Sequence, residues 1–141
     1  MAYQYAKNLK LPFNEVLEKV EDNLQEQGFS MLTSMDVKTQ MGSELGIRFR
    51  NYRIISACNT ELSYRAISLE PHIGTLLPCC IVVQEHENGT IEISALNPME
   101  SLDRNMVTSS LESVAREISD RLRTAIDTLH AKKDNLSFSY N

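Results

Sequence analysis

The stretch LPCCIVVQEHENGTIEISAL, from Leu77 to Leu96, decides the fold because it encodes two strands joined by a tight turn. Asn88-Gly89 between alternating apolar residues is a strong hairpin signal. A two-residue loop sets two glutamates opposite each other, whereas a three-residue loop over 87–89 separates apolar from polar side chains. The second register is therefore predicted, with Gly89 at a left-handed bulge position. Its apolar face holds Ile81, Val83, Ile91, Ile93 and Ala95.

This register also decides the direction of the two adjacent cysteines. Successive side chains on a strand point to opposite faces, so Cys79 joins the apolar face and Cys80 the polar one. Two such residues make a poor pair of metal ligands, and the positions of His72 and His86 fit no zinc pattern. No metal site and no cofactor are predicted.

The segments on either side of the hairpin complete the domain. Tyr52 to Cys58 is apolar on both faces, which is typical of an interior strand. We expect strands at 2–6, 29–37, 52–58, 77–86 and 90–96, a short helix over 38–45, and longer helices that begin near Pro12, Asn59 and Ser109. The prediction is a two-layer α+β fold, with a mixed, mostly antiparallel sheet of about five strands and helices packed on one face.

Three local patterns make finer predictions. Apolar and polar residues alternate from Phe29 to Val37, which favours a half-buried strand. Ser109 with Glu112 has the spacing of a capping box that opens the last, long helix. The segment after Pro71, which contains His72, is expected to be a loop.

Length and composition favour one domain over residues 1–133, with a frayed tail at 134–141. The chain has 141 residues, 42% of them apolar, which suffices for one core. A net charge of −5 argues against nucleic-acid binding, which needs a basic face. No signal pattern begins the chain, and no run reaches the roughly 18 apolar residues of a membrane span. Three cysteines, an odd number, favour reduced thiols and a cytoplasmic protein.

A family resemblance emerges from the motifs YRIISACN at 52–59 and GTLLPC at 74–79, together with Leu-Pro-Phe at 11–13, Gly28-Phe29 and the Asn-Gly turn. Over nearly its whole length the chain resembles the bacterial and archaeal proteins of the domain of unknown function 302 family. The resemblance implies a compact α+β domain that is often a homodimer, and it supplies no reaction. Thr60 stands where a proline often follows Cys-Asn, and Cys80 stands where a polar residue often follows Pro-Cys.

The candidate site residues are Cys58, Asn59, His72, Pro78 and Cys79. Cys58 ends a strand just before a helix N-terminus, where the helix dipole lowers a thiol pKa, but a free cysteine often packs as a small buried hydrophobe. Asn59 either binds a ligand through its amide or caps the helix. Cys79 follows Pro78 and either meets Cys58 or packs in the core. His72 is either a proton donor or base near the thiols or an exposed loop histidine.

Three hypotheses for function follow. The first is a cytoplasmic, homodimeric module that binds a small molecule or a partner in a pocket at the Cys58-Asn59 and Pro78-Cys79 strand ends. The second is a thiol-dependent enzyme or sulfur-handling protein that uses Cys58 or Cys79 as its nucleophile. The third is a structural or assembly protein with no reactive site. No catalytic triad, phosphate-binding loop or dinucleotide fingerprint occurs in the sequence.

Overall fold

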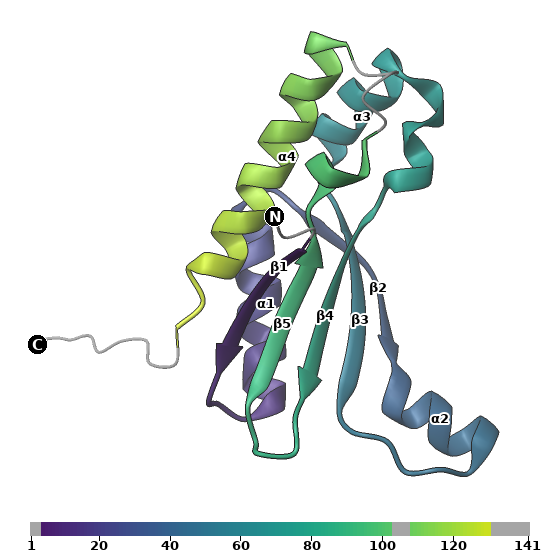
Figure 1. Cartoon of the computed structure of the whole chain (residues 1–141), viewed down its shortest axis with the longest axis vertical. Helices are drawn as coiled ribbons and strands as arrows, with labels where there is room; N and C mark the ends of the chain where they lie inside the picture. The colour runs from purple at the N-terminus through teal and green to yellow at the C-terminus, as the bar shows by residue number, and fades with distance from the viewer. Residues whose placement is uncertain (1–3, 103–107, 131–141) are drawn as a thin grey trace, which may run out of the picture.

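The computed structural model describes residues 4–102 and 108–130 (Figure 1). The elements, in chain order, are β1 (Gln4–Leu9), α1 (Phe13–Glu26), β2 (Ser30–Asp36), α2 (Val37–Leu45), β3 (Tyr52–Cys58), α3 (Thr60–Leu69), the 3-10 helix η1 (Pro71–Leu76), β4 (Cys79–Glu85), β5 (Ile91–Leu96), the 3-10 helix η2 (Pro98–Ser101) and α4 (Ser109–Asp127). The frayed tail expected at 134–141 lies outside the described residues.

The five strands form one sheet in the order β1-β5-β4-β3-β2, and each neighbouring pair is antiparallel. Helices α1 and α4 pack against one face of this sheet and against each other (Figure 1). The α+β prediction is therefore confirmed, with the correction that the sheet is antiparallel throughout and not mixed. The core is the layer between sheet and helices, where the apolar stripe of α4 is buried: Leu111, Val114, Ala115, Ile118, Leu122, Ala125 and Ile126, with Leu129 just beyond it.

The hairpin register is confirmed. The His86 N–H donates to the Thr90 carbonyl (N–O distance 2.8 Å), which leaves a three-residue loop over 87–89. Gly89 has a φ of +86°, the left-handed conformation that the bulge requires. All five apolar side chains assigned to the inner face are buried, Cys79 is buried with them, and Cys80 is exposed.

The helix boundaries follow local capping chemistry, with one correction. As expected, α1 begins after Pro12, α3 begins after Asn59 and α2 ends at Leu45; Gly46, in the left-handed conformation, follows it. The cap of α4 is Thr108 and not Ser109, because Thr108 is the last extended residue and its side chain accepts the Leu111 N–H (3.1 Å). The predicted capping box of Ser109 with Glu112 is therefore wrong by one position.

Three other features of the elements differ from the prediction. A bulge between Met31 and Thr33 breaks the alternation in β2, so Thr33 pairs beside Ser56 on the outer face and Met35 is 44% exposed. The predicted strand is present, but the expected burial of its alternate side chains is wrong after Met31, because an inserted residue reverses every later side chain. The first strand runs further than 2–6, to Leu9, and residues 1–3 lie outside the described part. The expected loop around His72 is the 3-10 helix η1.

Candidate functional site

The fold brings together the two strand ends that the sequence singled out. Ala57 on β3 lies directly opposite Cys79 on β4, so Cys58-Asn59 and Pro78-Cys79 occupy neighbouring positions at the same end of the sheet. Alternation places the Ala57 and Cys79 side chains on the covered face and that of Cys80, opposite Ser56, on the other face. The three thiols therefore gather at one end of β3 and β4.

Cys79 is a buried, protonated thiol. The pKa of the Cys79 thiol is raised to about 12, mainly by burial and in addition by the neighbouring Cys58 and Cys80, because a second negative charge close by is unfavourable. A nucleophilic cysteine needs the thiolate, and its pKa is normally lowered by nearby positive charge. The surroundings of Cys79 thus have the opposite effect from those of a catalytic cysteine.

Cys58 and Asn59 are both engaged in starting α3. The Cys58 thiol lies 3.0 Å from the Ser63 hydroxyl, across the first turn of the helix. Those two positions flank the helix start in the way that a hydrophobic staple does. The Asn59 side chain is buried, and its Oδ1 accepts the Leu62 N–H at 3.1 Å. Asn59 is therefore the N-cap of α3.

The other end of the Asn59 amide joins a polar junction between three helices. Its Nδ2 donates to the Gln27 carbonyl (3.4 Å), which also accepts from Arg121 of α4 (3.2 Å). Arg121 is held in turn by Glu117 at 3.0 Å. Gly28, with a φ of +88°, leaves the room for this contact, because a Cβ there would lie 2.9 Å from the Asn59 Nδ2. The junction ties the end of α1 to α3 and α4.

The hydrogen bonds of the His72 ring and backbone N–H go to Glu70 and not to the thiols. The His72 side chain is 89% exposed, and its Nδ1 lies 3.0 Å from a Glu70 carboxylate oxygen. The same carboxylate accepts the His72 backbone N–H (2.8 Å), which caps the start of η1. Among the described residues, the hydrogen bonds of His72 thus serve the geometry of η1.

A cavity of about 320 Å³ opens at the start of β4. Its lining contains no charged side chain and consists of Thr75, Leu76, Leu77, Pro78, Cys79, Cys80, Leu96 and Pro98. Two of the candidate residues, Pro78 and Cys79, are in this wall, whereas Cys58, Asn59 and His72 are not. The sequence reading missed Leu96 and Pro98, although the hairpin register already aligned the end of β5 with the start of β4. We refer to this space as the β4 cavity.

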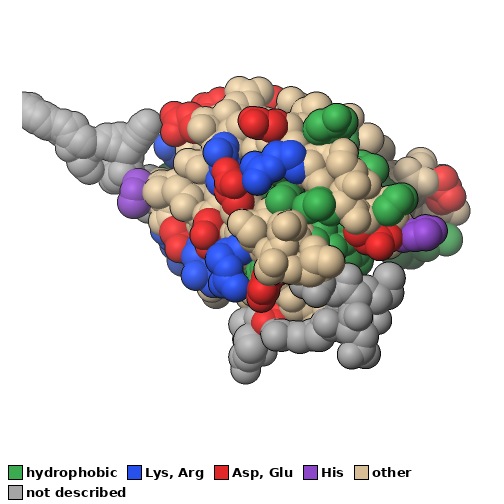
Figure 2. Space-filling model, turned by 90° about the horizontal axis from the view of Figure 1, so that it is seen from above, with side chains coloured by type: hydrophobic (Ala, Val, Ile, Leu, Met, Phe, Trp, Pro, Cys, Tyr) green, Lys and Arg blue, Asp and Glu red, His purple; other side chains and the backbone are tan. Residues whose placement is uncertain are grey.

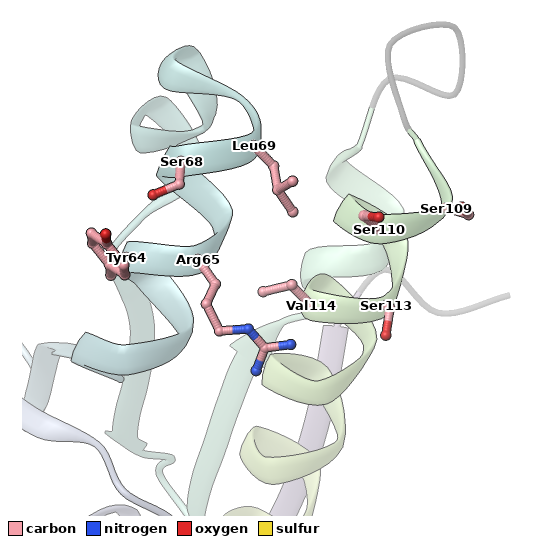
Figure 3. Close-up of a pocket in the computed structure, with 8 residues that line it drawn as sticks. All are labelled: Tyr64, Arg65, Ser68, Leu69, Ser109, Ser110, Ser113 and Val114. Carbon is pink, nitrogen blue, oxygen red and sulfur yellow. The ribbon is translucent and has the colours of Figure 1, made fainter.

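A larger and more polar groove lies between α3 and the first turns of α4. Its volume is about 550 Å³, and it is lined by Tyr64, Arg65, Ser68, Leu69, Ser109, Ser110, Ser113 and Val114. Arg65, Leu69 and Val114 point toward one another across the groove, whereas Tyr64 points away from α4 (Figure 3). Arg65 is paired with Glu117 at 3.6 Å, so its charge is partly compensated. We refer to this space as the α3–α4 groove.

The end of the molecule that carries α3 has scattered apolar side chains among charged ones (Figure 2). The largest exposed apolar side chains of α3 and η1 are Tyr64, Ile67, Leu69 and Leu76. Within residues 4–102 and 108–130, no three metal-binding side chains cluster. In the same part of the chain, every helix is too short or too polar to cross a bilayer.

Comparison with known proteins gives a family and a fold. The family model described as "Domain of unknown function DUF302" matches residues 5–129. The crystal structure of an uncharacterised conserved DUF302 protein from Bacillus stearothermophilus is similar to this chain at 28% sequence identity, with a TM-score of 0.80 over 90% of this chain and 98% of that one. No curated protein matches the chain.

Proposed function

The chain belongs to the DUF302 family, a domain of unknown function, and we propose that it is a module that binds a small, largely apolar molecule in the β4 cavity. The observation that carries this proposal is the lining of the cavity. It is uncharged and rich in leucine and proline, and it includes the buried Cys79. A volume of about 320 Å³ is within the range of small-molecule sites.

The lining restricts the chemistry of the ligand. A charged ligand would lose its hydration on entering the cavity and would find no opposite charge in the lining, so its binding would cost free energy. The Thr75 hydroxyl donates to the His72 carbonyl at 3.0 Å, so it offers a ligand chiefly its lone pairs. The ligand class is therefore a neutral molecule with one or two polar atoms that can donate a hydrogen bond.

The thiol-dependent alternative is less well supported. The raised pKa of Cys79 keeps its thiol protonated near neutral pH, and Cys58 is engaged with Ser63. A purely structural role for Asn59 in the junction with Gln27 and Arg121 is compatible with a binding module, since the cavity is lined by other residues. All three cysteines are free thiols, which supports a cytoplasmic protein.

A paired-variant binding experiment tests the proposal. Ligand-observed NMR would compare benzyl alcohol, a neutral probe, with benzoate, its anionic analogue, on the full chain. Leu76→Trp adds bulk to the β4 cavity, and Leu69→Trp adds the same bulk to the α3–α4 groove; the two leucines are similarly exposed, at 39% and 46%. We expect benzyl alcohol to bind better than benzoate, and only Leu76→Trp to abolish its signal. Equal binding of the two probes, or loss only in Leu69→Trp, would refute the assignment.

We also propose that the protein is a homodimer, as the family resemblance implied. Light scattering on the eluting protein would give twice the chain mass of 16.0 kDa for a dimer. A single-chain mass over a wide range of concentrations would exclude it.

A further inference from the structure

The sheet face opposite α1 and α4, which we call the open face, has an uncharged centre. The strand register places its side chains in rows across the sheet. One row consists of Met35, Ile54, Val82, Ser94 and Ala6, and the next of Thr33, Ser56, Cys80, Leu96 and Gln4. None of these side chains is charged, although 23% of the chain is. A sheet face that meets water normally carries charged side chains among its polar ones, whereas five of these ten side chains are apolar and none is charged, so the composition indicates a covered surface.

The exposure of the open face agrees with this reading. No helix of the described residues lies over it (Figure 1). Met35 is 44% exposed and Leu96 is 48% exposed, and Ile54 and Val82, which lie directly opposite each other, are half-buried. Apolar side chains therefore line the middle of a five-stranded sheet on its unprotected side. Such contiguous apolar surface is typical of an interaction site.

A second feature lies beside the open face. The segment 37–51, which we call the arm, follows β2 and carries α2 away from the body of the molecule (Figure 1). Only Val37 of this helix is buried, while Leu45 is 65% exposed and Ile47 is 47% exposed. A helix of nine residues is too short to be stable by itself in water. The arm therefore lacks, within one chain, the apolar surface that such a helix needs.

The base of the arm is nevertheless held firmly. Asp36 caps α2 by accepting the Thr39 N–H at 3.1 Å, and it pairs with Arg53 of β3 at 3.6 Å. The hydrogen bond from Thr39 lowers the pKa of the Asp36 carboxyl, so the cap is charged at neutral pH. The arm is thus oriented before it meets any partner.

We propose that the open face and the arm together form the interface of the homodimer, with the open face of a second copy packed against this one. This inference rests on the proposed homodimer and assigns its surface. An uncharged face is complementary to itself under a two-fold axis, as the sheets of a β-sandwich are. The arm holds three basic residues and one acidic residue, in a chain of net charge −5. The net positive charge of the arm therefore favours contact with another copy of the same acidic molecule.

An interface of sufficient area requires both the open face and the arm. The two uncharged rows cover about 300 Å² per copy, taking strands about 4.8 Å apart and a repeat of about 6.6 Å along each strand. A stable interface buries roughly 800 Å² per partner. The face alone falls short, and the exposed apolar residues of the arm supply further contact. Because Cys80 and Leu96 belong to the open face and also line the β4 cavity, the partner would lie beside the proposed ligand site.

Three charge-introducing variants, measured as full chains by sedimentation equilibrium, test the interface. Val82→Lys changes the centre of the open face, Leu45→Lys changes the arm, and Tyr64→Lys is the control, because Tyr64 is 73% exposed on α3. Each variant acts twice in a two-fold interface, so a tenfold cost per lysine raises the dissociation constant about a hundredfold. We expect this rise for Val82→Lys and Leu45→Lys and no change for Tyr64→Lys. Leu45 is so exposed that its variant folds even if Val82→Lys does not.

The possible outcomes separate the two proposals. A wild-type protein that is monomeric at every concentration overturns both the homodimer and its interface. A wild-type dimer whose dissociation constant is unchanged in Leu45→Lys and in folded Val82→Lys overturns only the interface. A dimer that is weakened equally by Tyr64→Lys also overturns the interface, because the weakening would then result from the added charge itself and not from its position.

Discussion

Replacing Asn59 with alanine is the sharpest test of how this site is built. Asn59 is 6% exposed, and its Oδ1 satisfies the N–H of Leu62, itself only 2% exposed. Loss of an N-cap costs about 1 kcal/mol. The bond from Asn59 Nδ2 to the Gln27 carbonyl is long, at 3.4 Å, and Arg121 also serves that carbonyl, so its loss adds about 0.5 kcal/mol. We expect Asn59→Ala to lower the free energy of unfolding by about 1.5 kcal/mol.

Asn59→Asp isolates the cap from the amide donor. Aspartate keeps the acceptor for Leu62 and places a negative charge at the start of α3, which is favourable, but it cannot donate to Gln27. We expect it to cost less than about 1 kcal/mol. Urea unfolding of both variants, followed by circular dichroism at one protein concentration, gives the two free energies. An Asn59→Ala protein as stable as wild type would refute the capping role and return Asn59 to the candidate ligand residues.

Three further outcomes are expected. Gly28→Ala should destabilise the protein by about 2 to 3 kcal/mol in urea unfolding, because Gly28 has a φ of +88° and a Cβ there would lie 2.9 Å from the Asn59 Nδ2. The matched control is Gly46→Ala, which should cost only about 1 kcal/mol, because Gly46 also has a positive φ but a Cβ there would meet no atom within 4 Å. Alkylation at pH 7 followed by mass spectrometry should leave Cys79 unmodified until the protein unfolds, and early labelling of Cys79 would contradict its burial. Folding raises the pKa of Cys79 from 9.0 to about 12, so the contribution of this thiol to the free energy of unfolding is full below pH 9 and is lost as the pH rises toward 12, by at most about 4 kcal/mol. The free energy of unfolding of Cys79→Ala should therefore depend less on pH over that range.

Much of the fold was predictable because its signals are local. Asn88-Gly89 and the alternating side chains beside it determine the hairpin register, since turn type and a two-residue period act over a few positions. The same holds for Asn59, whose cap requires only the backbone three residues ahead. The apolar stripe of α4 depends on a 3.6-residue period and needs no knowledge of its partners.

The errors came where distant parts of the chain compete with local preference. The alternation from Phe29 to Val37 is regular in sequence, yet pairing with β3 leaves Leu32 as an extra residue and turns Thr33 and Met35 outward. Thr108 and Ser109 are both good cap residues, and the backbone conformation selects the first. No local pattern distinguishes these outcomes, because each depends on the geometry of a neighbouring element.

By itself, the sequence determined most of the elements, the hairpin and the separation of Cys79 from Cys80, because these follow from short-range periodicity and turn chemistry. Only the tertiary structure decided which residues share a site. The sheet order set Cys79 opposite Ala57, the end of β5 closed the β4 cavity with Leu96, and Arg121 met the junction of Asn59 and Gln27 from far along the chain. Such contacts depend on how strands and helices pack, and packing joins residues that no local pattern relates.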